Sequence, residues 1–476
     1  MKKEKILKRL DQCDLHRRRL ISSALTIAVG SALFPIIGFA GQSKAPADPW
    51  QYARTLRQQI QPPQFPERDF PVTDFGAVGD NKTDCTAAIN DAIGACSGAG
   101  GGRVVVPAGD YRTGAVHLLS NVNLHIEEGA TLSFYTDAAR YLPHVFTRFE
   151  GTEYMGYSPL IYAYEQENIA ITGAGTLDGR AKTENWWSWK EGKNGNPANN
   201  PTKDRLTAMA AEGVPPEQRK FGDDSRLRPS FVQPYKCRNV LIEGIRVRRA
   251  PFWQIHPVLC TNVLVRGVDV KSHGFNNDGC NPESCRHVLI EDCRFDTGDD
   301  CIAIKSGRNA DGRRVNVPSE DILVANCKMK AGHGGVVVGS EMSGGVRNVY
   351  VEDCRMSSPD LWYMLRIKTN SLRGGFVENV HLRNTKVGTI GKAAIRINFH
   401  YSDGDVGEFV PRVSNVTVTD VTGDDIRQVL SLQGYERSPV QNVHISDCRF
   451  KGVKEADLIE HVDNLVLDNV YSDFGK

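Results

Sequence analysis

A short motif that recurs along most of the chain is the feature that most restricts its fold. Each copy begins with Asn, His or Asp and continues with apolar residues at alternate positions, as in SNVNLHI at Asn121 and RNVLIEG at Asn239. From Asn239 onward, consecutive copies lie 22 to 36 residues apart. A constant motif with variable spacing indicates one structural unit with loops of different length between its copies. The copies begin at Asn121, Asn168, Asn239, Asn262, His287, Asp321, Asn348, Asn379, Asn415, Asn442 and Asn464.

The alternation within each copy predicts short strands, because successive side chains of a strand point to opposite faces. Repeats of this length, which cannot bury their own apolar face, predict an all-β fold, a single-stranded right-handed parallel β-helix. Equivalent residues would then stack about 4.8 Å apart, and the recurring Asn and Cys residues would form ladders inside the coil. A leucine-rich horseshoe lacks its signature here, and a propeller would need longer blades.

An N-terminal helix is expected to cap the open end of this stack, where exposed strand edges invite pairing with other chains. The segment TDCTAAINDAIGAC predicts a helix with Thr83 or Asp84 as N-cap, ending at about Ala95. Its apolar residues on one face are Ala88, Ile89, Ala92 and Ile93.

The first forty residues have the composition of an export signal. A basic segment with the run Arg17-Arg18-Arg19 precedes an apolar stretch that ends in a small-x-small pattern at Ala40. A twin-arginine signal fits this pattern, and an uncleaved anchor is the alternative. We expect residues 1–40 to direct export to the periplasm or the extracellular space, 41–66 to form a linker and 67–476 to form one β-helical domain.

The cysteines are expected to be free thiols. Eleven of the 12 lie beyond the signal, an odd number for an oxidising compartment. Cys293, Cys327, Cys354 and Cys448 occupy the same place in successive repeats, which is typical of small buried apolar residues. Whether Cys85 pairs with Cys96 stays open at this point.

One long polar segment, at about 180–232, interrupts the repeats. Loops of this length are functional or disordered, and the tryptophans Trp186, Trp187 and Trp189 favour function. We expect this insertion to form a wall of a ligand site. Its tryptophans would stack on a sugar, which makes Trp186 and Trp187 candidate substrate-binding residues, or fill a small core of their own.

Matching the repeats brings a set of ionisable residues to one face. If Cys280 and Cys301 are equivalent, Asp278 lies level with Asp299. Matching IAIKSG to VVVGSE then places His333 level with Asp299 on the next coil. Arg366 and Lys368, in LRIK, lie one coil further and on alternate residues, so their side chains point to the same face. The residues brought to this face are Asp278, Asp299, Asp300, His333, Arg366 and Lys368.

These residues span roughly 15 Å at the strand spacing of a sheet. Each alone has an ordinary structural explanation, such as an Asp in a turn or a charged pair on a solvated strand. Three converging carboxylates do not, because like charges held together destabilise a fold unless they are used or neutralised. Paired carboxylates hydrolyse glycosidic bonds: one protonates the leaving oxygen and the other activates water. Inversion would require about 6.5 to 9.5 Å between them.

The motifs NND, GDD, GHG and RIK, in this order, resemble the polygalacturonases of glycoside hydrolase family 28, and the resemblance runs from about Phe70 to the C-terminus. It implies a pectin-lyase-like solenoid and an inverting pectin hydrolase that needs no metal or other cofactor. By this resemblance Asp299 is the general acid, Asp278 and Asp300 activate water, and His333 tunes the proton of the acid.

The resemblance further implies that Arg366 and Lys368 bind the sugar carboxylate. Asn276, Lys305 and Tyr401 are further candidate substrate-binding residues. Asn277 departs from the family, which more often has Thr or Ser between the Asn and the Asp, and we expect an effect on substrate placement more than on chemistry.

Several alternatives differ in substrate or mode. The insertion and the loop at 308–316 favour release of galacturonate from a chain end, as in bacterial exo-acting members, over endo cleavage. A rhamnogalacturonan hydrolase would need less cationic contact, a pectate lyase would need calcium, and a β-helical carbohydrate-binding surface protein would not need three aspartates. With 58 basic and 57 acidic residues, net charge indicates no nucleic-acid partner. We expect a monomer that does not bind membranes once the signal is removed.

Overall fold

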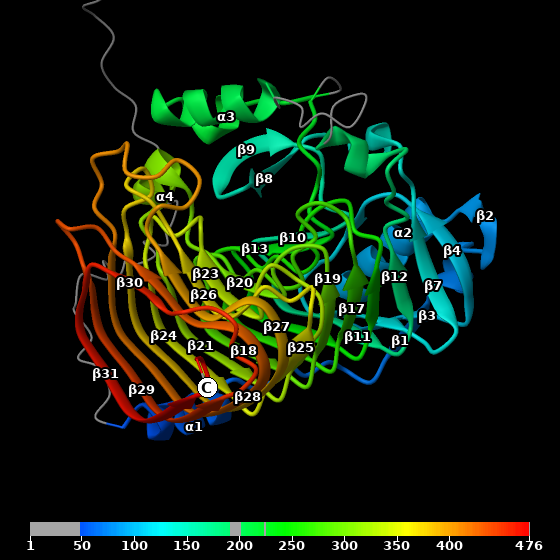
Figure 1. Cartoon of the computed structure of the whole chain (residues 1–476). Helices are drawn as coiled ribbons and strands as arrows, with labels where there is room; N and C mark the ends of the chain where they lie inside the picture. The colour runs from blue at the N-terminus through cyan, green and yellow to red at the C-terminus, as the bar shows by residue number, and fades with distance from the viewer. Residues whose placement is uncertain (1–47, 191–200, 223–224, 476) are drawn as a thin grey trace, which may run out of the picture. The chain divides into compact units, whose positions relative to one another are not determined.

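The structure, a computed structural model, describes residues 48–190, 201–222 and 225–475. Its strands pair in parallel from coil to coil, so that the chain forms the parallel β-helix that the repeats predict (Figure 1). Each coil contributes strands to three parallel sheets. The expected export signal, residues 1–40, lies outside the described residues.

The first sheet carries the repeated motif, and each of its strands pairs with the equivalent strand of the next coil. In stacking order it consists of β1 (Asp69–Pro71), β3 (Gly102–Val106), β6 (Val122–Ile126), β11 (Glu167–Gly173), β14 (Arg238–Glu243), β16 (Thr261–Arg266), β18 (Arg286–Glu291), β21 (Ser319–Ala325), β24 (Val346–Glu352), and the first parts of β27 (Phe376–Asn398), β28 (Arg412–Gln433), β29 (Val440–Phe450) and β31 (Val462–Ser472).

The second sheet stacks in the same order along the coil. Its strands are β2 (Asp80–Asp84), β4 (Gly109–Thr113), β7 (Ala130–Phe134), β12 (Thr176–Asp178), β15 (Arg246–Arg248), β17 (Asp269–Ser272), β19 (Arg294–Thr297), β22 (Lys328–Met329), β25 (Arg355–Ser358) and later parts of the four long strands β27, β28, β29 and β31.

The third sheet carries the functional face. It consists of β5 (Val116–His117), β10 (Ile161–Tyr164), β13 (Val232–Tyr235), β20 (Ile302–Ile304), β23 (Val336–Gly339), β26 (Tyr363–Lys368), the ends of β27 and β28, and β30 (Leu458–Glu460). Single parallel bridges at Ile255 and Cys280 link β13 to β20. The interior is lined by buried Val, Ile, Leu and Cys side chains.

The recurring asparagines form the expected ladder, but at a turn rather than in the apolar core. Asn168 donates to Asn121 (3.0 Å) and Asn239 donates in turn to Asn168 (2.8 Å). These residues have left-handed backbone angles, φ 54° at Asn168 and 56° at Asn239, which Asn tolerates better than most residues. The amide ladder therefore fixes the same turn in coil after coil.

The cysteines do lie in the core, as expected. All eleven in the described residues are free and buried, including Cys293, Cys327, Cys354 and Cys448. Cys85 and Cys96, whose pairing the sequence left open, are free as well.

Helix α2 (Thr86–Gly98) caps the N-terminal end of the stack and buries Ala88, Ile89, Ala92 and Ile93, the predicted apolar face. It begins later than predicted. Cys85 is the N-cap, and the Asp84 carboxylate accepts a hydrogen bond from the Thr86 backbone (3.0 Å) just before the first turn. The helix also ends three residues beyond Ala95, because Gly98 still follows helical geometry.

Residues 41–66 were expected to form a linker, but their described part contains helix α1 (Pro49–Gln59). The prediction is wrong for these helical residues. The Asp48 side chain accepts hydrogen bonds from two backbone amides of the first turn, and a proline at the first helical position favours the helix. The buried residues Ala53, Leu56 and Ile60 pack against leucines on the outer face of the first sheet. Burying such side chains contributes roughly 1.5–3 kcal/mol for each large one, enough to hold a three-turn helix.

Further elements lie outside the coil. They are the antiparallel hairpin β8 (Val145–Phe149) and β9 (Thr152–Gly156), the short helices η1 (Val72–Phe75), η2 (Ala138–Tyr141), η3 (Trp186–Trp189) and η4 (Pro216–Gln218), and the helices α3 (Pro201–Ala211) and α4 (Asn309–Val315). Figure 1 shows α3 and the hairpin β8–β9 on the same side of the coil as α4. None of the helices in the described residues is long and apolar enough to cross a membrane.

Candidate active site

Strand register brings the three aspartates together, with one shift from the prediction. Cys280 pairs with Ile302 rather than with Cys301, so Asp278 lies level with Asp300 and not with Asp299. Because both cysteines are buried, the similar sequences DGC and DDC suggest a pairing that is one residue out of register. The rest of the register is as predicted: Ile302 pairs with Val336, which places His333 level with Asp299.

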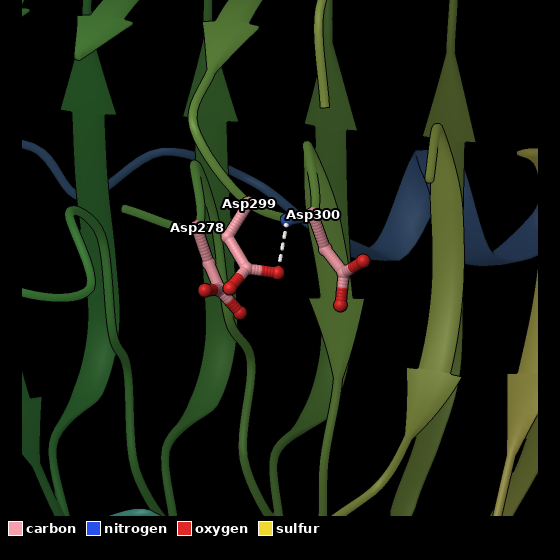
Figure 2. A group of neighbouring side chains, drawn as sticks. All are labelled: Asp278, Asp299 and Asp300. Atoms are coloured by element: carbon pink, nitrogen blue, oxygen red, sulfur yellow. Dashed lines mark hydrogen bonds between the residues drawn. The ribbon is translucent and has the colours of Figure 1, made fainter. Parts of the chain in front are cut away.

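The carboxylates of Asp278, Asp299 and Asp300 form one cluster, in which each offers an oxygen within 4.8 Å of the others. Figure 2 shows the side chains of Asp278 and Asp299 side by side, with Asp300, the next residue along the chain from Asp299, beside them. The backbone amide of Asp300 donates to Asp299 (2.9 Å). Measured between nearest oxygens, the carboxylates are closer than the gap of about 6.5 to 9.5 Å expected for inversion.

The Asp299 carboxylate is the most exposed of the three and is hydrogen-bonded to an imidazole. His333 Nδ1 lies 2.9 Å from Asp299 Oδ1. The ring of His333 stacks on Trp362, with centroids 3.9 Å apart and planes 17° apart, and Lys392 Nζ lies 3.3 Å from the centroid of the Trp362 ring. Trp362 thus restricts rotation of the imidazole that faces Asp299.

Two buried lysines neutralise the other carboxylates. Lys368 Nζ donates to Asp300 Oδ2 (2.7 Å), and Lys305 Nζ lies 3.6 Å from Asp278 Oδ2. Asn281 donates a further hydrogen bond to Asp278 (2.9 Å). These fixed ammonium groups therefore offset part of the negative charge of the cluster.

The surroundings shift the pKa values of two neighbouring carboxyl groups, Asp278 and Asp299, in opposite directions. Burial raises the pKa of Asp278 well above its ordinary value, and the charges of Asp299 and Asp300 add to this rise. Burial also pushes the pKa of Asp299 upward, but the hydrogen bond and charge of His333 outweigh it, so this pKa lies below its ordinary value. In the free protein the cluster therefore holds a proton more readily on Asp278 than on Asp299.

A cavity of about 520 Å³ opens above the cluster, within the size range of sites for small ligands. Its lining is mostly polar and charged. The lining residues are Glu150, Lys190, Lys203, Trp253, His273, Gly274, Phe275, Asn276, Asp278, Gly298, Asp299, Lys305, Arg308, His333, Ser340, Glu341, Lys368, Arg373, Tyr401 and Ser402.

Most of the residues singled out in the sequence meet at this cavity. Asn276, Lys305 and Tyr401 line it together with the carboxylates. Asp300 is fully buried behind them. Arg366 is absent from the lining: its guanidinium lies 3.7 Å from Asp300 and packs over the ring of Tyr401.

Trp186 and Trp187, which were expected either to stack on a sugar or to fill a small core of the insertion, do not line the cavity. Trp186 is 1% exposed and packs against Tyr141 and Trp189 in the core. Trp187 is half-buried, donates its indole hydrogen to the Ala250 carbonyl (3.0 Å) and packs against the backbone of Gly274. These rings pack against the main core of the coil rather than in a separate core of the insertion, which differs from the other alternative as well.

The insertion does form a wall of the cavity, through Lys190 and Lys203. Lys203 lies on α3 and pairs with Glu150, at the turn of the hairpin β8–β9. Sequence reasoning singled out the loop that begins at Arg308 but not the Arg308 side chain, and it missed Glu150 and Arg373. All three lie on loops outside the repeat, so no register connects them to the aspartates.

Asn277 is buried and holds the loop rather than facing the cavity. Its side-chain amide donates to the carbonyls of Ala250 (3.2 Å) and Phe252 (3.1 Å), and its oxygen accepts from the Gly274 amide (3.0 Å). The expected effect on substrate placement can therefore only be indirect, through the backbone of Asn276 and Asp278.

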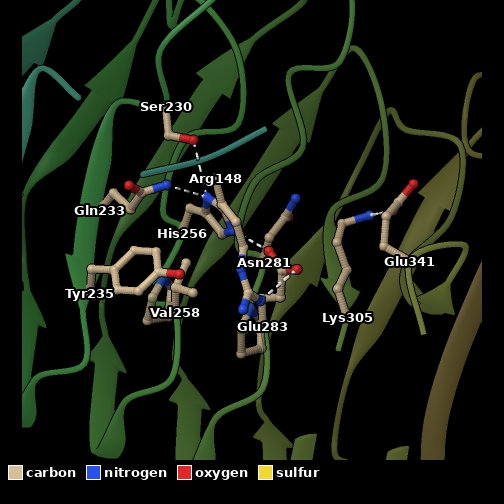
Figure 3. A network of polar contacts seen from close by, with 12 residues as sticks. Arg148, Ser230, Gln233, Tyr235, His256, Val258, Asn281, Glu283, Lys305 and Glu341 are labelled. Carbon is tan, nitrogen blue, oxygen red and sulfur yellow. Dashed lines mark hydrogen bonds and ion pairs between the residues drawn. The ribbon is translucent and has the colours of Figure 1, made fainter. Parts of the chain in front are cut away.

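A buried polar network lies under the cavity (Figure 3). Glu283 binds Arg148 (3.0 Å) and His256 (2.8 Å), and the His256 ring is further fixed by Gln233 (2.9 Å). Lys305 continues the series toward the cavity, where it donates to Glu341 (2.9 Å). Buried hydrogen-bond networks of this kind rigidify the groups that they hold.

Comparison with known proteins was consistent with this geometry. Residues 216–467 match the profile of Glycosyl hydrolases family 28, and residues 70–125 match Rhamnogalacturonase A/epimerase, pectate lyase-like. The crystal structure of a hyperthermoactive exopolygalacturonase from Thermotoga maritima is 45% identical, with a TM-score of 0.86, over 89% of this chain and 96% of that one.

Two curated relatives are more distant. A probable polygalacturonase of Vitis vinifera is 27% identical over 79% of this chain and 73% of its own length. An exo-poly-alpha-D-galacturonosidase of Dickeya chrysanthemi is 28% identical over 74% of this chain, which spans 62% of that longer protein.

Proposed function

Because the chain belongs to glycosyl hydrolases family 28 and is a glycoside hydrolase, we propose that it degrades pectin by hydrolysing α-1,4 bonds between galacturonate residues, one sugar at a time from a chain end. The observation that carries this proposal is the carboxylate cluster of Asp278, Asp299 and Asp300 beneath a cation-rich cavity. The 45% identity to an exopolygalacturonase supports the exo mode.

We assign Asp299 as the general acid, because it is the most accessible carboxylate and is hydrogen-bonded to His333. Because the pKa of Asp299 is lowered and that of Asp278 is raised in the free protein, Asp299 would take up a proton from Asp278 when substrate binds. Asp299 then protonates the glycosidic oxygen as the bond to the anomeric carbon breaks. Asp278 and Asp300 take the proton of the attacking water.

The pKa directions leave one rival assignment, in which Asp278 is the acid and Asp299 the base. An aryl galacturonide with a nitrophenol leaving group separates the two, because such a leaving group needs no proton. If Asp299 is the acid, D299N retains much of its rate on this substrate and almost none on polygalacturonate, whereas D278N loses both. The reverse pattern would exchange the two roles.

Inversion is proposed from the family resemblance, since the short carboxylate spacing does not support it by itself. Proton NMR of the first product decides the question. Inversion of an α-linkage yields the β-anomer first, whereas the α-anomer would indicate a covalent intermediate on one of the aspartates.

The charges of the cavity suit a uronate. Lys368 and Tyr401 lie beside the cluster, and Arg366 is immediately behind them, so we propose that these residues bind the sugar carboxylate at the cleaved bond. Asn276 and Lys305 would contact hydroxyl groups. A rhamnogalacturonan is the second candidate substrate, since residues 70–125 match a rhamnogalacturonase profile.

The site of action is proposed from the sequence. The basic and apolar N-terminal segment 1–40 supports export to the periplasm or the extracellular space, where pectin occurs. We further propose that the enzyme acts as a monomer, without a nucleic-acid or membrane partner.

The direct test is hydrolysis of polygalacturonate in the presence of a chelator, for the wild type and D299N. We expect reducing ends to appear with the wild type only, without the ultraviolet absorbance of unsaturated products. Absorbance that requires calcium would instead mean a lyase, and no product would favour rhamnogalacturonan as substrate.

A further inference from the structure

One basic side chain that lines the cavity, Arg373, is buried and forms no ion pair among the described residues. Six basic side chains line the cavity: Lys190, Lys203, Lys305, Arg308, Lys368 and Arg373. Lys203 and Arg308 pair with Glu150, and the two inner lysines pair with Glu341 and Asp300.

Within the described residues, Arg373 forms no ion pair with any carboxylate. Glu341 contributes negative charge nearby, but it is held by Lys305 at 2.9 Å. Lys190 also forms no ion pair among the described residues, but its side chain is exposed and is therefore solvated. Arg373 is different because it is 2% exposed, and its Nε has no hydrogen-bond partner.

Burial without a direct ion pair is costly for a guanidinium. Burial, together with the neighbouring charge of Arg308, lowers the pKa of Arg373 below its ordinary value. An anion that entered the cavity beside Arg373 would remove this cost. The buried charge of Arg373 therefore destabilises the free protein, and a negatively charged ligand beside it would be bound favourably.

The loop that carries Arg373 is fixed before any ligand binds. The side-chain oxygen of Asn370 accepts from the backbone amides of Leu372 and Arg373 (both 3.0 Å). Arg313 donates to the carbonyls of the same two residues (both 3.1 Å), and Arg373 itself donates to Asn309 (2.7 Å). The guanidinium is thus preorganised, so binding an anion requires little further ordering.

We propose that Arg373 binds the carboxylate of a second galacturonate residue. This residue is the neighbour, along the substrate chain, of the galacturonate whose carboxylate Arg366 and Lys368 bind. This inference rests on the proposed function. Arg366 and Lys368 are engaged with Asp300 and serve the sugar beside the catalytic cluster. Arg373 follows β26 by five residues and lines the same cavity, so it reaches a neighbouring sugar of an anionic chain. A guanidinium binds a carboxylate through two parallel hydrogen bonds.

The test compares kcat and KM of the wild type, R373Q, R373K and the control R355Q on trigalacturonate and on its methyl ester. Arg355 lies on β25, is exposed and is absent from the cavity lining. On the acid, we expect R373Q to lose about 10- to 100-fold in kcat/KM, mostly through KM, the range for a hydrogen-bonded charge. R373K should recover part of this loss, because it restores the charge but not the paired hydrogen bonds.

On the methyl ester, R373Q should differ from the wild type far less than on the acid, because the ester carries no charge for Arg373 to bind. An unchanged KM for R373Q, or an equal loss on acid and ester, would overturn the proposal. If R373Q does not fold, R373K gives the same decision, with a smaller expected rise in KM. Failure of the proposed function is a separate result, since the wild type itself would then be inactive on trigalacturonate.

Discussion

A buried histidine under helix α1 predicts that the enzyme loses stability in mild acid. His381 is 8% exposed, stacks on Tyr350 at 5.5 Å and meets the edge of Trp50, from α1, at 6.5 Å. Its Nδ1 lies 2.8 Å from the Thr417 hydroxyl. Burial lowers the pKa of His381 from 6.5 to about 4, because the charged ring has no water around it.

The sign and the size follow from this pKa. Between pH 6.5 and pH 4 the unfolded chain binds a proton at this position and the folded chain does not, so stability falls as the pH falls. A shift of this size corresponds to about 2.5 kcal/mol between pH 7.5 and pH 4.5. H381Q, which cannot be protonated, loses contacts at every pH but should escape this acid-dependent part.

Urea unfolding followed by tryptophan fluorescence measures the effect, because Trp50 contacts the His381 ring. From pH 7.5 to pH 4.5, the free energy of unfolding of the wild type should fall by about 2.5 kcal/mol relative to that of H381Q. The matched control is H444Q, an exposed histidine on the same sheet two coils away. A free-energy difference that stays constant with pH, or that changes equally with H444Q in place of H381Q, would refute the argument.

Three further predictions concern the active site. D299N should reduce kcat on polygalacturonate by at least about 100-fold with KM little changed, measured by reducing-end assay; an unchanged kcat would exclude Asp299 as acid. D278N should raise the melting temperature at pH 8, and by a smaller amount at pH 5, because a raised pKa means that ionised Asp278 opposes folding. Calorimetry that shows a lower melting temperature for D278N than for the wild type at pH 8 would contradict this. W362A should shift the pH profile of kcat while W362F preserves it, since the stacked ring orients His333; equal profiles would mean that the stack only adds stability.

The repeat made most of the architecture predictable. Alternating apolar residues and a recurring Asn require stacked strands with a common turn, and that register alone placed His333, Arg366 and Lys368 near Asp299. The one-residue error at Asp278 arose where no strand connects β13 to β20 and only single bridges set the pairing.

Features outside the repeat were not predictable in the same way. Glu150, Arg308 and Arg373 reach the cavity from loops whose positions depend on tertiary packing rather than on the coil. Helix α1 did carry local signals, Asp48 before Pro49 and apolar residues that return after three or four positions, but proline-rich sequence beside it favoured a linker. The tryptophans Trp186 and Trp187 were ambiguous, because a buried ring and a sugar-stacking ring have the same sequence signature.

The central claim, cleavage of galacturonan from a chain end, is tested most directly by one time course. Polygalacturonate is digested without calcium, and products and solution viscosity are followed together. Galacturonate is expected from the earliest time points while viscosity is nearly unchanged. A rapid fall in viscosity with mixed oligomers would contradict it, since such products come from internal cleavage.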